Sequence, residues 1–237
     1  MRLHPRKGAP SCRDSSVGGP LLWPAEEQWP VCADAECPGG AGTPLVPIVQ
    51  VHQAHALPQV HWRSAAVDAV LPTPPPPPDA LEDYVPDACV VHPEQVTEYP
   101  SWDLPEDVHS ALSPRFDQLE DETGWMYQYH LADAPGIKLG GYPGWTQEPV
   151  WPDCASCGRR MDHLLTVASW EYDGESWRTW LPVEDRAVVD GEDTSRSGQG
   201  LAAQDAAGLM LGDAGGVYIF ECRSCPDRPI EHRFDCS

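Results

Sequence analysis

Residues 18–32 read GGPLLWPAEEQWPVC, and residues 140–154 read GGYPGWTQEPVWPDC. Both stretches fit the pattern GG-x3-W-x2-E-x2-WP-x-C without a gap. Seven identities at fixed spacing, several of them in rare residue types, are hard to obtain by chance even in a chain rich in Gly and Pro. A pattern written twice in one chain indicates an internal duplication.

Each copy continues in the same way after the shared pattern. A second cysteine follows, Cys37 in the first copy and Cys157 in the second. After it comes an apolar run of strand character, residues 45–51 in the first copy and 161–167 in the second. The duplicated unit is therefore expected to be built from strands.

The composition agrees with a strand-rich fold. The 27 Pro and 20 Gly among 237 residues interrupt the chain too often for long helices, and 41% hydrophobic residues are enough to form a core. We predict an α+β, β-rich fold in which two duplicated antiparallel-sheet lobes, residues 18–70 and residues 139–237, pack together. The second lobe is predicted to carry a zinc-ribbon-like four-cysteine site.

Three segments lie outside the two lobes or interrupt them. Residues 1–17 are basic and are expected to form a disordered arm. Residues 71–138 are expected to hold a Pro-rich linker, with Pro74–Pro78 as an extended polyproline II spacer, followed by an amphipathic helix. Residues 185–208, rich in Gly, Asp, Ser and Ala, are expected to form a mobile surface loop.

The helix is predicted from apolar residues that recur at three- and four-residue spacing. These residues are Leu104, Val108, Leu112, Phe116 and Leu119. Pro114 is expected to kink or split the helix. The following residues, 125–131, fit a strand and a continuation of the helix equally well.

The second copy contains two Cys-x2-Cys pairs, Cys154 with Cys157 and Cys222 with Cys225. Each pair adjoins a predicted strand, so antiparallel pairing of the two strands would bring four thiolates together. Four cysteine ligands suit tetrahedral zinc and leave no open position for water, so we predict one structural Zn²⁺. The alternative is four ordinary or redox-active thiols.

The first copy offers a less complete set of metal ligands. Cys32, Cys37, His52 and His55 follow the spacing C-x4-C-x14-H-x2-H, in which the two histidines lie close for a two-Cys, two-His zinc site. These four residues are candidates for a second metal site. The alternative is a degenerated copy whose histidines are solvated.

The net charge restricts the classes of partner. Fifteen Lys and Arg against 37 Asp and Glu give a formal net charge of −22, and the lysines are Lys7 and Lys138 alone. Nucleic acid requires a basic stripe that this chain lacks, whereas an acidic protein favours basic partners. No apolar stretch resembles a signal peptide or reaches the ~20 residues of a membrane span, so a cytoplasmic protein is expected.

Motifs of the common catalytic sites are absent from the sequence. It contains no G-x-S-x-G elbow, no P-loop, no G-x-G-x-x-G after a strand and no H-E-x-x-H. Cys89 and His92 would point to opposite faces of a strand, and Asp213 fits a turn better than a catalytic acid. No catalytic residue is predicted.

Several of these residues resemble a known family. The segment KLGGYPGW at residues 138–145, the CxxCG at residues 154–158, and GVYIF-x-C at residues 216–222 resemble the "KLGG-P-W … C-x-x-CG … LYVF-C" pattern of the programmed cell death protein 2 family. Residues 211–218, LGDAGGVY, are similar to a strand motif of the bacterial YwqG-like family, and both families belong to the TYPP domain superfamily. The excess of Arg over Lys and of Ala, Gly and Pro indicates a bacterial, YwqG-like protein.

The resemblance implies an α+β fold with duplicated sheet units. It also implies the role of a chaperone, because the eukaryotic relatives hold a highly basic ribosomal protein. We therefore expect a non-enzymatic, zinc-stabilised protein whose acidic surface holds a basic protein partner. Two alternatives are an immunity protein that neutralises a toxin and a hydrolase acting on a nucleotide or RNA.

Four tryptophans of the repeated pattern are candidate anchors for that partner, because Trp is enriched at interface hot spots. They are Trp23, Trp29, Trp145 and Trp151. The alternative for each is packing in the core, which the neighbouring Gly and Pro residues favour.

Overall fold

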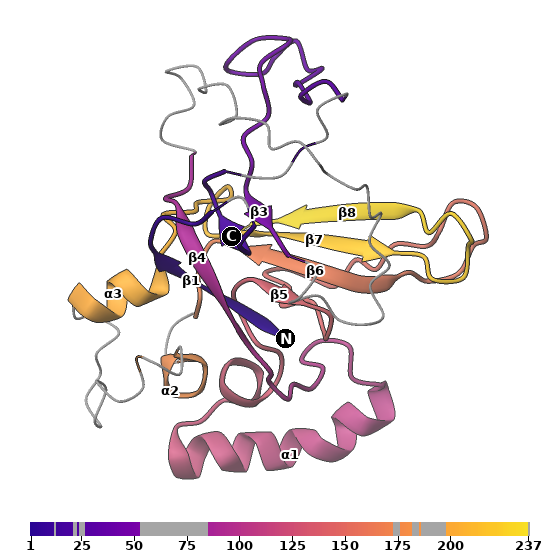
Figure 1. The fold of residues 1–237 in the computed structure, drawn as a ribbon. Coiled ribbons are helices and arrows are strands. Elements are labelled where there is room, and N and C mark those ends of the chain that lie inside the picture. The colour runs from indigo at the N-terminus through magenta and orange to yellow at the C-terminus, as the bar shows by residue number, and fades with distance from the viewer. Residues whose placement is uncertain are drawn as a thin grey trace. The chain divides into compact units, whose positions relative to one another are not determined.

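The structure is a computed structural model that describes residues 1–11, 13–20, 23, 27–52, 85–172, 176–181, 185 and 198–236 (Figure 1). Its strands are β1 (Arg2–Lys7), β2 (Ser16–Val17), β3 (Val49–Gln50), β4 (Cys89–Glu94), β5 (Lys138–Leu139), β6 (Asp162–Ala168), β7 (Gly216–Glu221) and β8 (Ile230–Asp235). Its helices are α1 (Glu106–Thr123), a π-helix (Tyr127–Leu131), α2 (Trp177–Trp180) and α3 (Gly198–Gln204). The predicted β-rich fold is confirmed, and residues 125–131 contain a π-helix.

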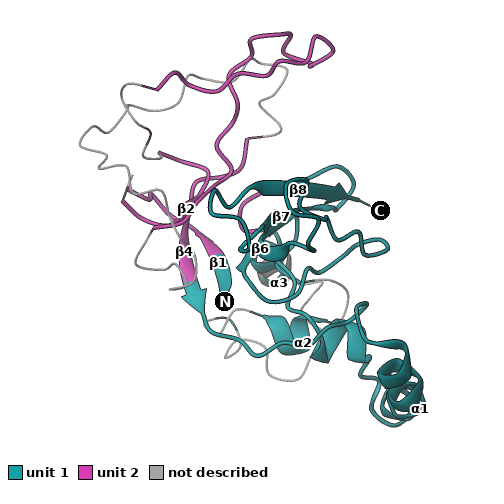
Figure 2. Ribbon diagram, turned by 90° about the vertical axis from the view of Figure 1, so that its right-hand side faces the viewer, with its two compact units in different colours: residues 1–4, 93–205, 210–237 teal, residues 5–92, 206–209 magenta. Residues whose placement is uncertain are grey.

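The strands follow one hydrogen-bonded order, β3-β2-β4-β1-β5-β6-β7-β8, in an eight-stranded sheet. By compactness the chain divides into residues 1–4, 93–205 and 210–237 (unit 1) and residues 5–92 and 206–209 (unit 2) (Figure 2). The unit boundaries pass along β1 and β4, so the first copy lies in unit 2 and the second copy, apart from residues 206–209, lies in unit 1. Strands of both units nevertheless belong to the one hydrogen-bonded sheet. The structure thus shows a single sheet and not the two lobes that the duplication predicted.

Exchange of strands between the repeats explains this correction. β2 and β5 each end directly before the first glycine of a copy of the repeated pattern, and β1 and β4 are the strands that precede them in the chain. β1 pairs with β5 and β4 pairs with β2, so each leading strand is bonded to the other copy's strand. The strand pairing therefore joins the two copies in one sheet.

The two copies nevertheless have the same local structure. Val17 pairs with Val49 in the first copy, and Leu139 pairs with Leu165 in the second. The first glycine of each copy then donates its N–H to a carbonyl of the partner segment. Gly18 donates to Ile48 and Gly140 donates to Leu164, both at 2.8 Å. The predicted duplication is thus visible in the backbone.

The paired glycines are required by their backbone conformation. Gly18, Gly19, Gly140 and Gly141 all have positive φ, at 58°, 79°, 65° and 76°. A Cβ on Gly18 would lie 2.7 Å from the carbonyl oxygen of Pro86, and one on Gly141 would overlap the carboxylate of Glu98. Only glycine combines this turn with such close packing.

The copies differ in the turn that carries the cysteines. The N–H of Cys32 donates to the carbonyl of Thr43 at 2.7 Å, and the N–H of Cys154 donates to the carbonyl of Arg159 at 2.8 Å. These partners are 11 positions apart in the first copy and 5 in the second, so the first turn is six residues longer. The extra residues separate Cys32 from Cys37 and lengthen the tip of the turn.

The core of unit 1 lies on the strands of the second copy, where β6, β7 and β8 are adjacent (Figure 1). β6 and β7 pair from Asp162↔Glu221 to Ala168↔Gly216. Trp145 packs over this pair, with its ring 4.6 Å from that of Tyr218 and 5.8 Å from that of Phe220, measured between centroids. All three aromatic residues are buried.

The N-terminal arm was expected to be disordered, and this prediction is wrong. Residues 2–7 form β1, in which Arg2, Leu3 and His4 are buried. Arg2 donates to a carboxylate oxygen of Glu171 at 3.0 Å and to the carbonyls of Glu171 and Trp180. Arg2, one of the charges that made this segment resemble a solvated arm, is thus paired inside the protein.

Other segments between the strands agree with the predictions in part. The predicted helix forms as α1 and continues through Pro114 without splitting. Within the expected loop 185–208, residues 198–204 form α3 and Ala206 and Ala207 are buried, so this end of the segment is structured. The proline run Pro74–Pro78 lies outside the described residues. No helix among the residues described is long and apolar enough to cross a membrane.

The ion pair of Arg2 gives a test of the buried N-terminal strand. We expect Arg2→Ala to lower the free energy of unfolding by about 3–5 kcal/mol, because it leaves Glu171 buried without its charged partner. Lys7→Ala is the matched control on the same strand, since the Lys7–Asp87 pair is exposed and should contribute about 1 kcal/mol or less. Denaturant unfolding of both variants in zinc-containing buffer measures the difference. Equal stability of the two variants would contradict the assignment.

Candidate metal centre

Four cysteine sulfurs meet at one end of the β6–β7–β8 sheet. Cys154 and Cys157 lie in the turn that leads into β6, and Cys222 and Cys225 lie in the connection from β7 to β8. Antiparallel pairing of β6 with β7 puts the two turns at the same end of the strands. The structure therefore brings together the four cysteines that the sequence predicted as ligands.

The sulfur positions fit a tetrahedral ion. All four Sγ atoms lie within 4.8 Å of one another. Cys154 Sγ is 3.8 Å from Cys225 Sγ, and Cys157 Sγ is 3.6 Å from Cys222 Sγ. Tetrahedral zinc with Zn–S bonds of about 2.3 Å requires sulfurs about 3.8 Å apart. The cluster could hold one metal ion such as zinc.

Each turn is held by its own backbone. In the first, Gly158 has φ 66° and donates its N–H to the carbonyl of Cys154 at 2.8 Å. In the second, Arg228 has φ 45° and donates its N–H to the carbonyl of Cys225 at 3.1 Å. Two guanidinium nitrogens of Arg228 also lie 2.7 Å from the carboxylate oxygens of Glu221, the last residue of β7. This contact fixes the second turn to its strand.

The protonation of the four thiols explains why the cluster suits a cation. Desolvation of the Cys154 thiol opposes ionisation, but the N–H groups of Cys157 and Ser156 donate to its sulfur and lower its pKa to about 7. Hydrogen bonding with Cys157 and desolvation raise the pKa of Cys225, and desolvation raises that of Cys222. One thiolate opposes formation of the next, so a dication is needed to stabilise four of them.

With four protein ligands the ion would have no open position for a substrate. Its chemistry would be to hold the two turns together, and cysteine ligands of this kind belong to structural sites. Cys154 and Cys222 are buried and pack in one cluster with Trp145, Met161 and Phe220. A metal here would therefore join the turns to the aromatic core of unit 1.

The proposed second site has no comparable geometry. Among the described residues, the four-cysteine cluster is the one group in which three or more potential ligands meet, and Cys32, Cys37 and His52 belong to no such group. Cys32 and Cys37 lie in the longer turn of the first copy, and His55 is outside the described residues. The first copy also has no described counterpart of the β7–β8 hairpin that supplies the other two cysteines.

The four candidate tryptophans occupy different environments. Trp145 is buried in the core. Trp151 is half-buried, donates to Asp103 at 2.8 Å and carries the guanidinium of Arg160 at 3.9 Å from its ring centre. Trp23 and Trp29 are half-buried and lie against each other, with ring centroids 5.4 Å apart. Of the four, Trp145 has the environment of core packing and not of an exposed anchor.

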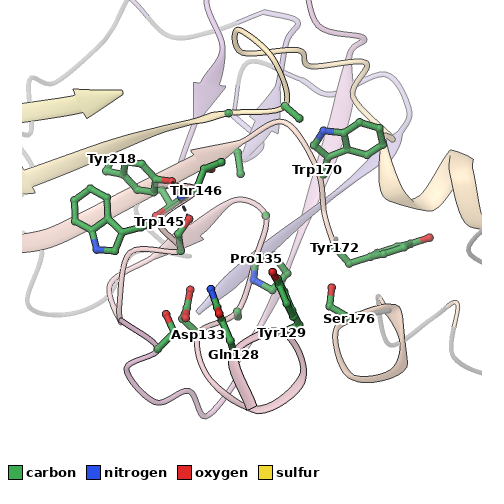
Figure 3. A pocket seen from close by; sticks show the side chains of 18 of the residues that line it. Gln128, Tyr129, Asp133, Pro135, Trp145, Thr146, Trp170, Tyr172, Ser176 and Tyr218 are labelled. Carbon is green, nitrogen blue, oxygen red and sulfur yellow. Dashed lines mark hydrogen bonds between the residues drawn. The ribbon is translucent and has the colours of Figure 1, made fainter. Parts of the chain in front are cut away.

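A second feature of unit 1 was not found from the sequence. It is a pocket of about 380 Å³ near the aromatic core, and Asp133 is the one carboxylate among its described lining residues (Figure 3). Asp133 stands in no recognisable motif. The signal that could have directed attention to it is Lys138, one of two lysines in the chain, which is buried beside Glu98.

The metal site predicts a defined metal content. We expect about one zinc per chain in the purified protein and loss of that zinc in Cys157→Ser, because a three-cysteine site binds more weakly. Cys157 is exposed, so the substitution changes little of the packing. Cys236→Ser is the control, since Cys236 lies outside the cluster. Metal analysis by mass spectrometry measures both variants.

The same measurement tests the first copy. Two zinc ions per chain, with one lost in Cys32→Ser, would establish the second site. Zinc retained in Cys157→Ser, with unchanged thermal unfolding, would contradict the four-cysteine site.

Comparison with known proteins adds no assignment: no protein-family model matches the chain, and no curated protein matches it.

Proposed function

We propose that this protein is a zinc-stabilised, non-enzymatic binding protein of the YwqG-like family that holds a basic protein partner, as a chaperone or an adaptor. The observation that carries the proposal is the net charge of −22 on 237 residues. Such a charge attracts a basic polypeptide over a distance of several ångströms and repels nucleic acid. The proposed zinc is structural, because four cysteines leave it no open ligand position.

Helix α1 offers a surface suited to such a partner. None of its side chains is buried. The helix contains one basic residue of fixed charge, Arg115, and six acidic residues. The acidic residues are Glu106, Asp107, Asp117, Glu120, Asp121 and Glu122. We propose that α1 is part of the surface that contacts the basic partner.

The pocket of unit 1 supports a binding role over a catalytic one. Its described lining contains Asp133 and three tyrosines as ionisable groups, with no His, Cys, Lys or Arg. General acid–base and nucleophilic catalysis usually need two such groups within hydrogen-bond reach of each other. A lone carboxylate among aromatic rings fits recognition of a ligand.

The experiment is affinity capture of the tagged protein from its own cells at moderate and at high salt, with quantitative mass spectrometry. We expect one basic protein at near-stoichiometric level at moderate salt and its loss at high salt, because salt screens exposed charges. Near-stoichiometric retention of one protein, in place of many basic proteins at low levels, would separate this role from non-specific adsorption.

A charge variant of α1 is the matched test. Asp117→Asn, Glu120→Gln and Asp121→Asn together remove three negative charges near the C-terminal end of the helix, where acidic residues oppose the helix dipole. The helix should therefore remain folded while retention of the partner falls. An absence of any basic partner at both salt concentrations would overturn the proposed function, whereas an undiminished partner would exclude α1 from the surface.

A further inference from the structure

The pocket of unit 1 combines aromatic walls with one carboxylate. Its volume of about 380 Å³ falls within the range of about 300–1,000 Å³ that small-ligand sites occupy. In Figure 3, Asp133 and Gln128 enter from one side, Trp145 and Tyr218 line a second side, and Trp170 lines a third. The aromatic residues around it are Trp102, Tyr129, Trp145, Trp170, Tyr172 and Tyr218.

Asp133 is the carboxylate of the described pocket lining, and it forms no ion pair with a described residue. The buried cations beneath the pocket are paired: Lys138 lies 3.1 Å from Glu98, and Arg2 lies 3.0 Å from Glu171. Asp133 accepts a hydrogen bond from the hydroxyl of Ser101, but no cation among the described residues lies within ion-pair distance of it. Asp133 therefore brings to the pocket a carboxylate that no described residue neutralises through an ion pair.

The position of the carboxylate is fixed by close packing. A Cβ on Gly144 would lie 2.9 Å from Oδ2 of Asp133, so the carboxylate lies directly against the backbone of that glycine. Desolvation raises the pKa of Asp133 above its ordinary value, even though Lys138 acts in the opposite direction. Asp133 is half-buried, and a carboxylate that has lost part of its hydration gains from a cation that replaces it.

We infer that this pocket binds a basic side chain, the guanidinium of an arginine or the ammonium of a lysine, with Asp133 as its counter-ion and the aromatic rings as its walls. This inference rests on the proposed function, because it takes the ligand to be a side chain of the basic partner. It assigns to that partner one anchoring residue.

The chemistry of the walls favours a cation over other ligands. The faces of Trp and Tyr rings attract cations, and guanidinium stacks on them as well. An anion would be repelled by Asp133 and would find no Lys or Arg in the described lining. A neutral apolar group would leave the carboxylate desolvated and unpaired, which is unfavourable.

The test is calorimetric titration of the zinc-loaded full chain with capped amino acids. We expect saturable binding of N-acetylarginine amide or N-acetyllysine amide and none of N-acetylcitrulline amide, which has nearly the shape of the arginine probe without its charge. Asp133→Asn should weaken binding about tenfold or more, because it removes the charge of the counter-ion. Glu148→Gln is the control, since it removes one negative charge from an exposed position outside both α1 and the described pocket lining.

A second variant keeps the inference testable if Asp133→Asn fails to fold. Trp102 lines the pocket and is 48% exposed, so Trp102→Leu removes an aromatic wall with little change to the core. We expect it to weaken binding several-fold, in line with the loss of one cation–π contact. Circular dichroism checks that both variants remain folded.

Three outcomes would overturn the inference. They are an absence of binding of either charged probe, equal binding of the citrulline probe, and unchanged affinity in folded Asp133→Asn. Tighter binding of putrescine than of both capped probes would assign the pocket to a free small cation and overturn the assignment to a protein side chain. Partner capture is measured separately, so a basic partner retained by Asp133→Asn would leave the proposed function intact while excluding this anchor.

Discussion

The exchange of leading strands between the two repeats is the constraint on which this structure depends. β1 precedes the first copy in the chain but pairs with β5 of the second, and β4 precedes the second copy but pairs with β2 of the first. Neither repeat can complete its strand pairing alone. A consequence is that β1 is buried, and its Arg2 needs a buried partner, which Glu171 supplies. The charged start of the chain is therefore part of the fold.

Within this shared arrangement the described parts of the two copies differ where the second copy carries its cysteines. The first copy has six extra residues in its cysteine turn, whereas the second retains a tight turn and is followed by the β7–β8 hairpin. The hairpin supplies Cys222 and Cys225, and the tight turn supplies Cys154 and Cys157. A tetrahedral site needs both parts, and the described part of the first copy offers one turn in an expanded form. The copy with the longer cysteine turn is thus the one whose described residues do not form a four-ligand cluster.

Much of the candidate site could be predicted from the sequence. Each CxxC pair forms its own tight turn, and antiparallel pairing of the strands beside the two turns brings them to the same end of the sheet. The duplication and the helix from Glu106 to Thr123 were also visible as periodic patterns. The burial of β1 could not be predicted, since Arg and His side chains are usually solvated. The partner of Arg2 lies 169 positions along the chain, and that of His4 lies 90 positions along it. The same holds for Asp133, whose role depends on which cations are already paired with Glu98 and Glu171. Patterns along the chain report local geometry, while the pairing of buried charges is decided by the tertiary structure.

The metal cluster and the pocket share part of their structure. Trp145 and Tyr218 pack in the same buried cluster as Cys154 and Cys222, and both also line the pocket. Tyr218 donates to the carbonyl of Gly144, the residue against which the Asp133 carboxylate lies. Tightly packed interiors transmit displacements because they have few voids to absorb them. A metal held by the two cysteine turns would therefore also fix the aromatic wall and the glycine that position Asp133. A structural ion would in this way help to shape the pocket that we infer to bind a cation, without touching it.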